Sequence, residues 1–237
     1  MTPSIVPIAG TDIRMVSGAW PLPDDLRAQV GPCWEKLFAA NPHLWDGRIL
    51  GVTAPRIDAD GVLRAEARED AYSAFLTWRD AGFPDTGMHN LFGSALIATN
   101  DGALIYGIMG AETANAGRVY PPGGSLEPRD VLPDGRVDVA ACTDLELEEE
   151  TGLFASAARR GALVAVFDGP RISIGQVYHF DEPSERLVAR IRANLDRQEH
   201  RELADVVAIR TRSDAERAGA VPYAVAVAEA FAAGNLG

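Results

Sequence analysis

The sequence has few cysteines and no long apolar run. Cys33 and Cys142 are its two cysteines, and neither belongs to a CxxC motif or a Cys/His cluster. This pattern indicates neither a disulfide framework nor a zinc site, and it favours a reducing compartment. The start of the chain lacks the basic segment and apolar core of an export signal, and no run approaches the roughly 20 apolar residues of a membrane span. We therefore expect a cytoplasmic protein without a membrane partner.

Basic residues are also scarce. The chain carries 22 Lys and Arg against 34 Asp and Glu, so its formal net charge is -12 and its pI is near 4.7. Such a charge repels a long polyphosphate strand, because nucleic-acid binders usually present a broad basic face. A nucleic-acid partner is therefore not expected. A small anionic ligand remains compatible, since a bound divalent cation and a few arginines reverse the potential locally.

The amino-acid composition is that of a globular protein. Hydrophobic residues make up 47% of the 237 residues and charged residues 24%. Residues 1–86 predict a small α+β subdomain. Its first helix is expected over 26–38, where apolar residues at helical spacing follow acidic N-cap candidates. Strands at 48–53 and 62–67 flank a turn, and a second helix is expected around residues 72–78.

Residues 87–237 predict a second domain in which strands and helices alternate. Strands are expected at 96–99, 103–108, 118–120, 162–167, 172–180 and 205–209, and helices at about 138–151, 183–196 and 222–233. The mixture indicates an α/β fold with a mixed β-sheet.

Three glutamates are predicted to converge near the end of the helix over 138–151. Side chains three and four positions apart share a helix face, so Glu146, Glu149 and Glu150 meet whereas Glu148 points away. Crowded carboxylates repel one another unless a cation lies between them. Mg²⁺ prefers carboxylate oxygens, water and substrate phosphates as ligands, and clustered Mg²⁺ ions can activate water for diphosphate cleavage. The competing interpretation is an acidic, solvated helix face.

A glycine pair precedes this helix. Pro121-Pro122-Gly123-Gly124 follows a predicted strand, and glycine lets the backbone approach a phosphate closely. Taken alone, the pair would indicate only a turn. After the helix, Gly152 is suited to the left-handed conformation that ends many helices.

Together these segments resemble the Nudix hydrolase family. The family's box is G-x5-E-x7-R-E-U-x-E-E-x-G-U, where U is aliphatic; Gly123-Gly124-Ser125-Leu126-Glu127 is similar to its opening and residues 145–153 are similar to its closing half. The resemblance implies an α/β/α sandwich over about 87–212. It also implies the roles of individual residues: Glu146, Glu149 and Glu150 as catalytic ligands of Mg²⁺ or Mn²⁺, and Gly123, Gly124 and Glu127 as substrate-binding residues.

The box departs from the family pattern in two ways. Leu145 stands where the family has an arginine, so the cation that orients the glutamates must come from elsewhere or be absent. The gap before Leu145 is also about seven residues longer than in the family, with the excess around 129–136, so that Val137 and its neighbour Asp138 stand near the position of the box's first glutamate. A further catalytic glutamate often comes from a later loop, and Glu199 and Glu202 are the candidates, with Glu202 preferred.

The first 86 residues are similar to the N-terminal region of Nudix proteins that hydrolyse UDP-glucose and UDP-galactose. The similarity lies in residues 34–47, 51–53 and 72–75. It implies hydrolysis of a nucleoside diphosphate sugar, with a UDP-sugar favoured, to a nucleoside monophosphate and a sugar 1-phosphate, by a monomer or homodimer. The alternatives are a Nudix hydrolase of ADP-ribose, a dinucleotide or a coenzyme A derivative, and a catalytically degenerate nucleotide-binding module.

Some residues with chemical potential receive a weaker assignment. Arg118, Arg129 and Arg171 are candidates for phosphate contacts, with solvent exposure as the default interpretation. No histidine is assigned a catalytic role, because a lone histidine is more often structural. The aromatic residues of the first 86 positions are expected mainly in the core, although one of them could line a nucleotide pocket.

Overall fold

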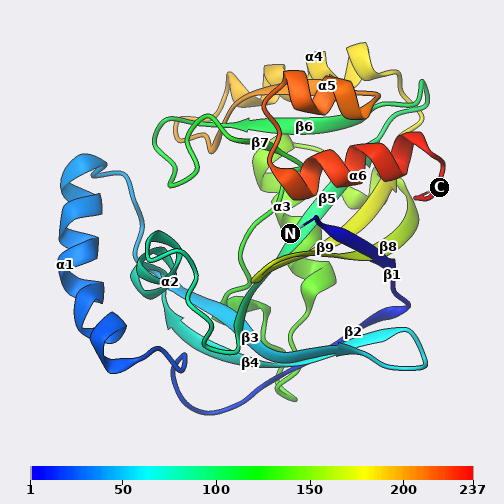
Figure 1. The fold of residues 1–237 in the computed structure, drawn as a ribbon. Coiled ribbons are helices and arrows are strands. Elements are labelled where there is room, and N and C mark those ends of the chain that lie inside the picture. The colour runs from blue at the N-terminus through cyan, green and yellow to red at the C-terminus, as the bar shows by residue number, and fades with distance from the viewer. Residues whose placement is uncertain (1, 237) are drawn as a thin grey trace.

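The strands of the protein form one mixed sheet that bends sharply at β5 (Figure 1). The computed structural model describes residues 2–236. In chain order, the strands are β1 (Ser4–Pro7), β2 (Gly10–Met15), β3 (Arg48–Ile57), β4 (Val62–Ala71), β5 (Met88–Ala98), β6 (Leu104–Met109), β7 (Val119–Tyr120), β8 (Arg159–Asp168), β9 (Arg171–His179) and β10 (Leu203–Ile209). The helices are α1 (Asp24–Ala40), α2 (Tyr72–Asp80), α3 (Val139–Thr151), α4 (Ser184–Leu195), α5 (Arg212–Arg217) and α6 (Pro222–Ala232). The prediction of an α/β fold with a mixed sheet is confirmed.

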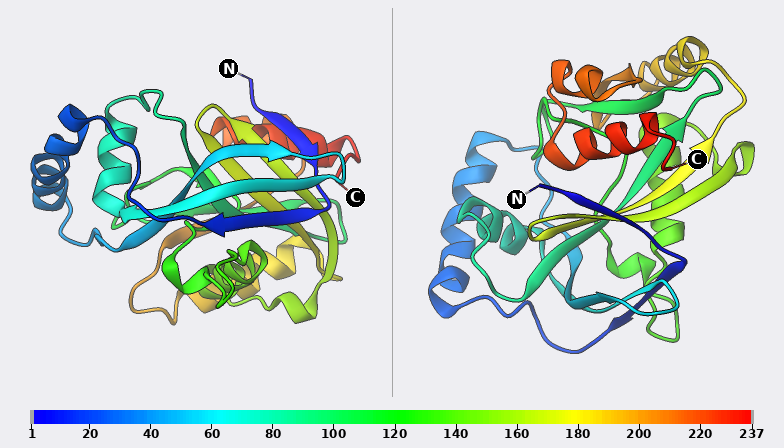
Figure 2. Two further views of the ribbon diagram at one scale, coloured as in Figure 1. Left: turned by 90° about the horizontal axis from the view of Figure 1, so that it is seen from below. Right: turned by 45° about the vertical axis from the view of Figure 1, so that its right-hand side comes forward.

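Helices cover both faces of the part of the sheet formed by β9, β5, β6 and β10. Leu147 of α3 and Leu187 of α4 pack in a core on one face. Tyr223 and Val227 of α6 pack in another core on the opposite face. The views in Figures 1 and 2 agree with this division, with α3 and α6 on either side of the strands. Leu147 is fully buried and anchors α3 to the sheet.

Strand β5 joins two differently oriented groups of strands. Its first residues pair with β3, through Val52 and His89, and its last residues pair with β6, through Ile97 and Ile105. Along its whole length from Asn90 it runs parallel to β9. On its other edge, between the two pairings, the chain after β7 takes the place of a strand. The amide of Gly93 donates to the carbonyl of Gly124 at 3.1 Å. The glycine pair is thus held against the middle of β5.

The first 86 residues contribute elements to both groups of strands. The β3–β4 hairpin and the helix after it form as predicted, and β2 runs parallel to β4. One core contains residues from both parts of the chain, with Leu50 and Leu63 beside Leu126 and Ile172. The division near residue 86 into a subdomain and a main domain stays a prediction.

Strands β1 and β2 lie where the sequence predicts no element. Val6 of β1 pairs with Ala165, and Ile13 of β2 pairs with Ala65. Both strands are short and their partners are distant in sequence, so hydrogen bonding to those partners, rather than local propensity, determines their conformation. None of the helices in residues 2–236 combines the length and apolar character needed to cross a bilayer.

Candidate active site

Helix α3 has strong boundaries at both ends. The side chain of Asp138 accepts a hydrogen bond from the amide of Ala141 at 3.0 Å, which caps the first turn. Gly152 has φ 70° and its amide donates to the carbonyl of Glu148, which confirms the predicted left-handed cap. The helix end that carries the glutamates is therefore fixed in position. Asp138 is committed to the helix cap.

The glutamates of α3 differ in burial. Glu146 and Glu150 are buried, with 8% and 3% of their surface exposed, whereas Glu148 and Glu149 are exposed. One oxygen of Glu150, Oε2, accepts a hydrogen bond from the amide of Gly123 at 2.8 Å. Its other oxygen, Oε1, is buried without a partner among the described residues. The helix thus presents two buried carboxylates to the glycine pair.

Close contacts with neighbouring atoms leave room only for glycine at both positions of the pair. A Cβ atom on Gly124 would lie 2.1 Å from Glu146 Oε1, and a Cβ atom on Gly123 would lie 2.2 Å from the carbonyl oxygen of Gly93. Neither distance is compatible with a side chain unless the neighbour moves. The turn thus packs closely against Glu146 and β5, and the predicted approach of its backbone to a phosphate stays a prediction.

Arg129 is the cation among these carboxylates. Its guanidinium lies 3.3 Å from Glu127, 3.9 Å from Glu146 and 3.8 Å from Glu149. It belongs to a 3-10 turn, Pro128–Asp130, in the segment that lengthens the box. A tight turn at Gly135 closes that segment, and its carbonyl accepts from the amide of Met15 in β2. The insertion therefore places a positive charge where the helix itself, with Leu145, provides none.

Burial and mutual repulsion raise the pKa values of several of these carboxyl groups. Burial raises the pKa of Glu146 to about 8, the charges of Glu202 and Glu149 add to the shift, and Arg129 opposes it. Burial raises the pKa of Glu150 well above its usual value, with Glu146 as the next cause. Burial also raises the pKa of Glu127, and Arg129 again opposes the shift. Three carboxyl groups are thus held where ionisation is costly.

Glu202 approaches the cluster from the segment before β10. Its backbone carbonyl accepts a hydrogen bond from the amide of Gly110 at 2.6 Å, which ties this segment to the end of β6. Burial of the carboxyl raises its pKa, with the charge of Glu149 as the second cause. Glu202 therefore lies with the predicted glutamates. Glu199 is outside the two cavities described next.

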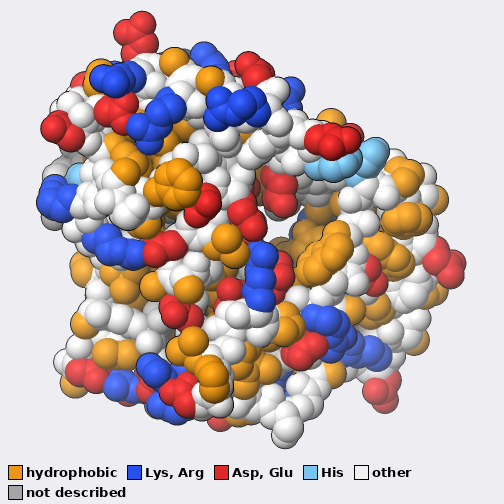
Figure 3. All heavy atoms as spheres, turned by 180° about the vertical axis from the view of Figure 1, so that it is seen from behind, with side chains coloured by type: hydrophobic (Ala, Val, Ile, Leu, Met, Phe, Trp, Pro, Cys, Tyr) orange, Lys and Arg blue, Asp and Glu red, His pale blue; other side chains and the backbone are white. Residues whose placement is uncertain are grey.

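Two adjoining cavities meet at the glycine pair. The smaller, with a volume of about 400 Å³, is lined by Glu127, Glu146, Glu149, Arg129 and other residues. The larger, with a volume of about 510 Å³, is lined by aromatic side chains and by Arg79, Arg118 and Arg171. Gly124, Ser125 and Glu202 line both. Figure 3 shows the surface hollowed between the α1–α2 part and the rest of the molecule, with acidic and hydrophobic side chains on its walls.

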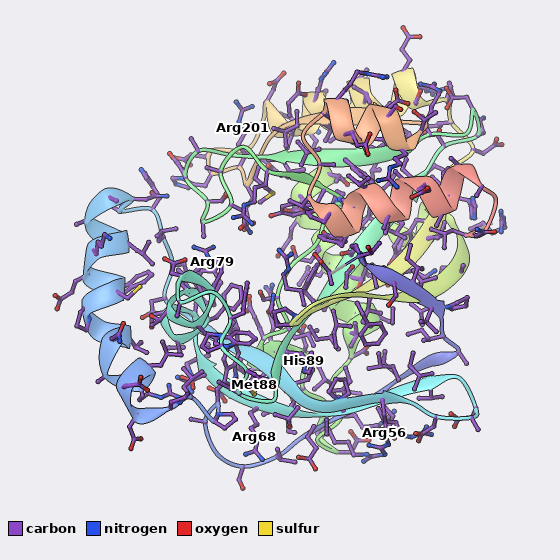
Figure 4. All side chains as sticks on the ribbon, in the orientation of Figure 1. Arg56, Arg68, Arg79, Met88, His89 and Arg201 are labelled. Atoms are coloured by element: carbon purple, nitrogen blue, oxygen red, sulfur yellow. The ribbon has the colours of Figure 1, made fainter. Side chains whose placement is uncertain are left out.

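The larger cavity lies between the first 86 residues and the later part of the chain. Tyr72, Phe75 and Arg79 come from α2, and Arg79 donates to the carbonyl of Ala114 at 3.3 Å. Figure 4 shows Arg79 pointing from α2 toward the loop after β6, with His89 at the start of β5 below it. Of the aromatic residues in the first 86 positions, Tyr72 and Phe75 line this cavity, and their contact with a nucleotide stays a prediction. Trp78 is instead in the core.

Sequence reasoning missed several residues that line this cavity. Asn90 and Phe92 of β5, Tyr120 of β7 and Tyr223 of α6 all border it. No motif marks them, because each comes from a different element and only the folded chain brings them together. Only Tyr120 could have been suspected as a site residue from the sequence, because it stands immediately before Pro121.

The carboxylates do not form a preformed metal-binding set. Within residues 2–236, no three His, Cys, Asp or Glu side chains are arranged to hold one metal ion. The cation among them is the guanidinium of Arg129, and the predicted metal roles of Glu146, Glu149 and Glu150 stay predictions.

Comparison with known proteins gives only distant likenesses. No protein-family profile matches the sequence, and no curated protein matches it. Among solved structures, the chain is similar to the MutT protein from Methanosarcina mazei Go1, with 19% identity over 62% of this chain and 95% of that chain and a TM-score of 0.42.

Two further structures resemble the same share of the chain. A Nudix hydrolase from Nitrosomonas europaea is 15% identical over 62% of this chain and 91% of that chain, with a TM-score of 0.42. The Nudix domain of Shewanella oneidensis NrtR, complexed with ADP ribose, is 10% identical over 62% of this chain and 87% of that chain, with a TM-score of 0.40. At these identities and TM-scores, the likeness assigns neither a family nor an activity.

Proposed function

We propose that this chain is a divalent-metal-dependent hydrolase of the Nudix type that cleaves the diphosphate of a nucleoside diphosphate sugar, with a UDP-sugar favoured. The products are a nucleoside monophosphate and a sugar 1-phosphate. The observation that carries the proposal is the meeting of an acidic cavity and an aromatic, arginine-lined cavity at Gly124 and Glu202. A nucleotide in the aromatic cavity would direct its diphosphate toward the carboxylates.

The acidic cavity and the buried carboxylate of Glu150 beside it offer oxygen ligands of the kind that Mg²⁺ or Mn²⁺ takes, although the side chains are not arranged around an ion among residues 2–236. Glu150 Oε1 is buried and unpartnered, and Glu146 lies against a glycine that leaves room for no side chain. A carboxylate oxygen buried without a donor is costly, and a cation removes the cost. We propose that Glu146, Glu149 and Glu150 hold the ion. When bound, it supplies charge neutralisation of the phosphate oxygens and a more acidic water.

The side chains around this cavity have separate proposed tasks. Glu202 accepts the proton of the attacking water, because its carboxyl stands where the two cavities meet. The water oxygen forms a bond to one phosphorus, and the bond from that phosphorus to the bridging oxygen breaks. Arg129 holds the glutamates in place and offsets their repulsion. The arginines of the larger cavity offer donors to the remaining phosphate oxygens.

A substrate panel tests the substrate class. Initial rates would be measured with Mg²⁺ on UDP-glucose, UDP-galactose, ADP-ribose, a dinucleoside polyphosphate and coenzyme A, with Glu149→Gln and Glu150→Gln as controls. We expect the UDP-sugars to be cut fastest, with equimolar UMP and sugar 1-phosphate, and both variants to lose roughly 100-fold or more. Faster cleavage of ADP-ribose, a dinucleotide or coenzyme A would replace the proposed substrate but keep the reaction.

A binding module without turnover is the second candidate. It is favoured by Leu145, by the displaced first acid of the box and by the lack of a preformed three-carboxylate set. In that case UMP or UDP-glucose would raise the melting temperature, while hydrolysis stayed at background and Glu149→Gln had no effect.

A further inference from the structure

The smaller cavity contains an exposed tryptophan. Trp45 lies in the loop between α1 and β3, lines this cavity and is 54% exposed. Phe38 and Phe154 are exposed to a similar degree, but they line neither of the two cavities. An aromatic ring that stays in water gives up part of the free energy that its burial would contribute to folding. The ring of Trp45 is therefore available to a ligand in the cavity.

The position of this ring is set by its neighbours. The ring occupies the space that a side chain at Gly47 would fill, since a Cβ there would lie 1.4 Å from Cζ2 of Trp45. The loop itself is anchored to the start of α2, because the carbonyl of Gly47 accepts from the amide of Tyr72 at 2.8 Å and Asp46 accepts from the amide of Ser73 at 2.7 Å. A ring placed before the ligand arrives lowers the entropic cost of binding.

Polar side chains accompany Trp45 in the cavity. Nε2 of His43 lies 3.6 Å from Oε1 of Glu112, and both residues line the cavity and are more than half exposed. The side chain of Asn41 donates to the carbonyl of Glu112 at 3.0 Å, which joins the loop after α1 to the loop after β6. A carboxylate accepts hydrogen bonds, and an imidazole donates and accepts them. The cavity thus combines one aromatic ring with both kinds of hydrogen-bonding group.

The place of the smaller cavity determines which part of the substrate enters it. The two cavities share Gly124 and Glu202, and the diphosphate is proposed to lie beside them. With the nucleoside in the larger cavity, the group on the other side of the diphosphate enters the smaller one. Trp45 lines only the smaller cavity. It therefore meets the group beyond the diphosphate.

The surroundings of Trp45 suit a hexose better than a second nucleoside. A hexose has a face of C–H groups, which packs on an aromatic ring, and a rim of hydroxyls that donate and accept hydrogen bonds. A nucleobase is apolar on both faces and is held best between parallel rings. The ring beside Trp45 is that of Tyr72, with centroids 6.3 Å apart and planes inclined by 43°. This arrangement leaves no space for a base between parallel rings.

We propose that Trp45 is the surface on which the hexose of the substrate packs, and that it makes the chain prefer sugar-linked diphosphates to dinucleotides. The C–H face of the hexose contacts the indole ring, and hydroxyls reach Glu112 and His43. The proposal deepens the proposed function and rests on it for the placement of the diphosphate. It assigns the choice between a sugar and a second nucleoside to the smaller cavity.

Two stable analogues isolate the contribution of the sugar. In both, a methylene group replaces the bridging oxygen of UDP, so that neither is cut. One analogue ends in glucose and the other in a methyl ester of the same charge. Calorimetry in the presence of Mg²⁺ would measure the Kd of each for the full chain. We expect the glucose analogue to bind at least about tenfold more tightly, because the methyl ester lacks the ring contact and the hydroxyls.

Variants of Trp45 connect this preference to the indole ring. In Trp45→Ala, the two Kd values should come within about twofold of each other, while the methyl ester binds as it does to the unaltered chain. A merely structural role would weaken both analogues alike. Trp45→Phe should restore part of the preference, since it keeps an aromatic face. Trp45→Leu replaces Trp45→Ala if the latter does not fold, with the same expected result.

The matched control is Phe38→Ala. Phe38 is another exposed aromatic residue of the first 86 positions, and it lines neither cavity. This variant should keep the full preference for the glucose analogue. Its result shows that loss of an exposed ring elsewhere does not change the two affinities.

Fluorescence gives a second measurement at the same site. Trp45 is the most exposed of the four tryptophans, and Trp20 and Trp78 are buried. A sugar on the indole ring removes water from it, so the emission should move to shorter wavelength with the glucose analogue and not with the methyl ester. Trp45→Phe should show no such difference between the two analogues.

The outcomes separate this proposal from the proposed function. Equal affinities for the two analogues, or a preference for glucose that persists in Trp45→Ala, would overturn the proposal even if UDP-glucose were hydrolysed. Tighter binding of an analogue with adenosine in place of glucose, lost in Trp45→Ala, would assign the ring to a nucleoside and also overturn it. A preference for glucose that depends on Trp45, in a chain that cuts no UDP-glucose, would support the proposal and refute the hydrolase.

Discussion

Gly124 controls where the carboxylate of Glu146 can lie. A methyl group at this position would stand 2.1 Å from Oε1 and 2.4 Å from Cδ of Glu146, and these atoms end a flexible side chain. The fold can therefore accept Gly124→Ala by moving the carboxylate. We expect the variant to lose roughly 100-fold or more in kcat/KM on UDP-glucose, while its free energy of unfolding changes by less than about 1 kcal/mol.

Gly31→Ala is the matched control for this change. A Cβ at Gly31, in α1, would meet nothing within 4 Å beyond its chain neighbours, and we expect full activity; no gain in stability is expected, because the ring of Pro32 crowds a Cβ on the preceding helical residue. Gly123→Ala should behave differently from both, because its methyl would strike backbone, the Gly93 carbonyl, and destabilise the chain by about 1–3 kcal/mol. Full activity of Gly124→Ala would show that the position of Glu146 does not matter.

Arg129 is expected to take the role of the arginine that the box lacks. Arg129→Gln should lower kcat/KM by about 10- to 100-fold, because the repulsion among Glu127, Glu146 and Glu149 is no longer offset. Adding Leu145→Arg to this variant should recover several-fold of the loss. Binding of Mn²⁺, monitored by electron paramagnetic resonance, gives a readout that is independent of turnover. The affinity for Mn²⁺ should change in Arg129→Gln and be restored in the double variant.

Arg136→Gln is the control within the same inserted segment. Arg136 is half exposed and pairs with Asp134, away from the glutamates. Arg136→Gln should leave the rate of hydrolysis and the binding of Mn²⁺ unchanged. Failure of Leu145→Arg to recover any activity or Mn²⁺ binding would argue that Arg129 only stabilises the insertion.

Single residues were predictable where their chemistry is local. Helix periodicity predicted that Glu146, Glu149 and Glu150 converge; Glu146 and Glu150 are buried together, whereas Glu149 is exposed and shares with Glu146 the guanidinium of Arg129. The left-handed cap at Gly152 followed from the backbone freedom of glycine. The position of Arg129 could not be predicted from the sequence, because the path of an inserted segment depends on contacts such as that between Gly135 and Met15. Asn90 carried no signal at all, since its neighbour Arg171 is 81 residues away and on another strand.

The turn after β5, the start of α4 and the end of β10 are tied together by one carboxylate. Asp101, in the turn after β5, accepts hydrogen bonds from Thr99, from the amide and hydroxyl of Ser184 at the start of α4, and from Arg210 after β10. These bonds hold the pKa of Asp101 well below its usual value, with the Thr99 bond as the largest cause. A turn, a helix and a strand end thus depend on one negative charge.

The depressed pKa makes this stabilisation dependent on pH. The contribution is fully present above the unfolded-state pKa, roughly 4, and is lost as the pH falls through the folded-state pKa. We expect Asp101→Asn to lower the urea midpoint at pH 7, and the difference from the unaltered chain to shrink toward pH 2. Asp196→Asn, at a side chain that is 79% exposed, should show no such trend. A difference that is constant with pH would contradict this explanation.

The later helices were the most predictable elements, whereas the central strand β5, predicted only at 96–99, begins at Met88. α3, α4 and α6 appear within two residues of their predicted ends, because their apolar residues follow the helical period. The strands of the first 20 residues and α5 were not predicted. β1 and β2 form only against distant partners, and α5 has six residues stabilised by a capping box at Thr211 and Asp214.

At the scale of the whole molecule, the first 86 residues are part of the site and part of the core. The amide of Leu50 donates to Leu126 at 2.7 Å, and β1 pairs with β8. Tyr72, Phe75 and Arg79 of α2 line the larger cavity. The two parts of the chain therefore enclose the proposed nucleotide together.

A shortened chain tests this dependence. Residues 87–237 alone would expose the core faces that contact Leu50 and Leu63 and would lose the partner of β8. We expect this fragment to show no cooperative thermal unfolding by circular dichroism and no binding of UMP. A fragment that melts cooperatively would establish residues 87–237 as an independent domain.

The net charge of -12 also has a consequence for the whole molecule. Anionic substrates are repelled at long range, and this repulsion is screened by salt. The proposed cation and the arginines of the larger cavity must therefore provide the attraction locally. The proposed dependence on a divalent metal is therefore expected from the charge as well as from the chemistry.

Release of UMP from UDP-glucose as a function of Mg²⁺ concentration tests the central claim most directly. The assay compares the unaltered chain with Glu150→Gln, which keeps the shape of the buried side chain that bonds Gly123. We predict saturable dependence on Mg²⁺, equimolar UMP and glucose 1-phosphate, and a rate that is lower in the variant by roughly 100-fold or more. Background release of UMP at every Mg²⁺ concentration, or equal rates in the two proteins, would contradict the account.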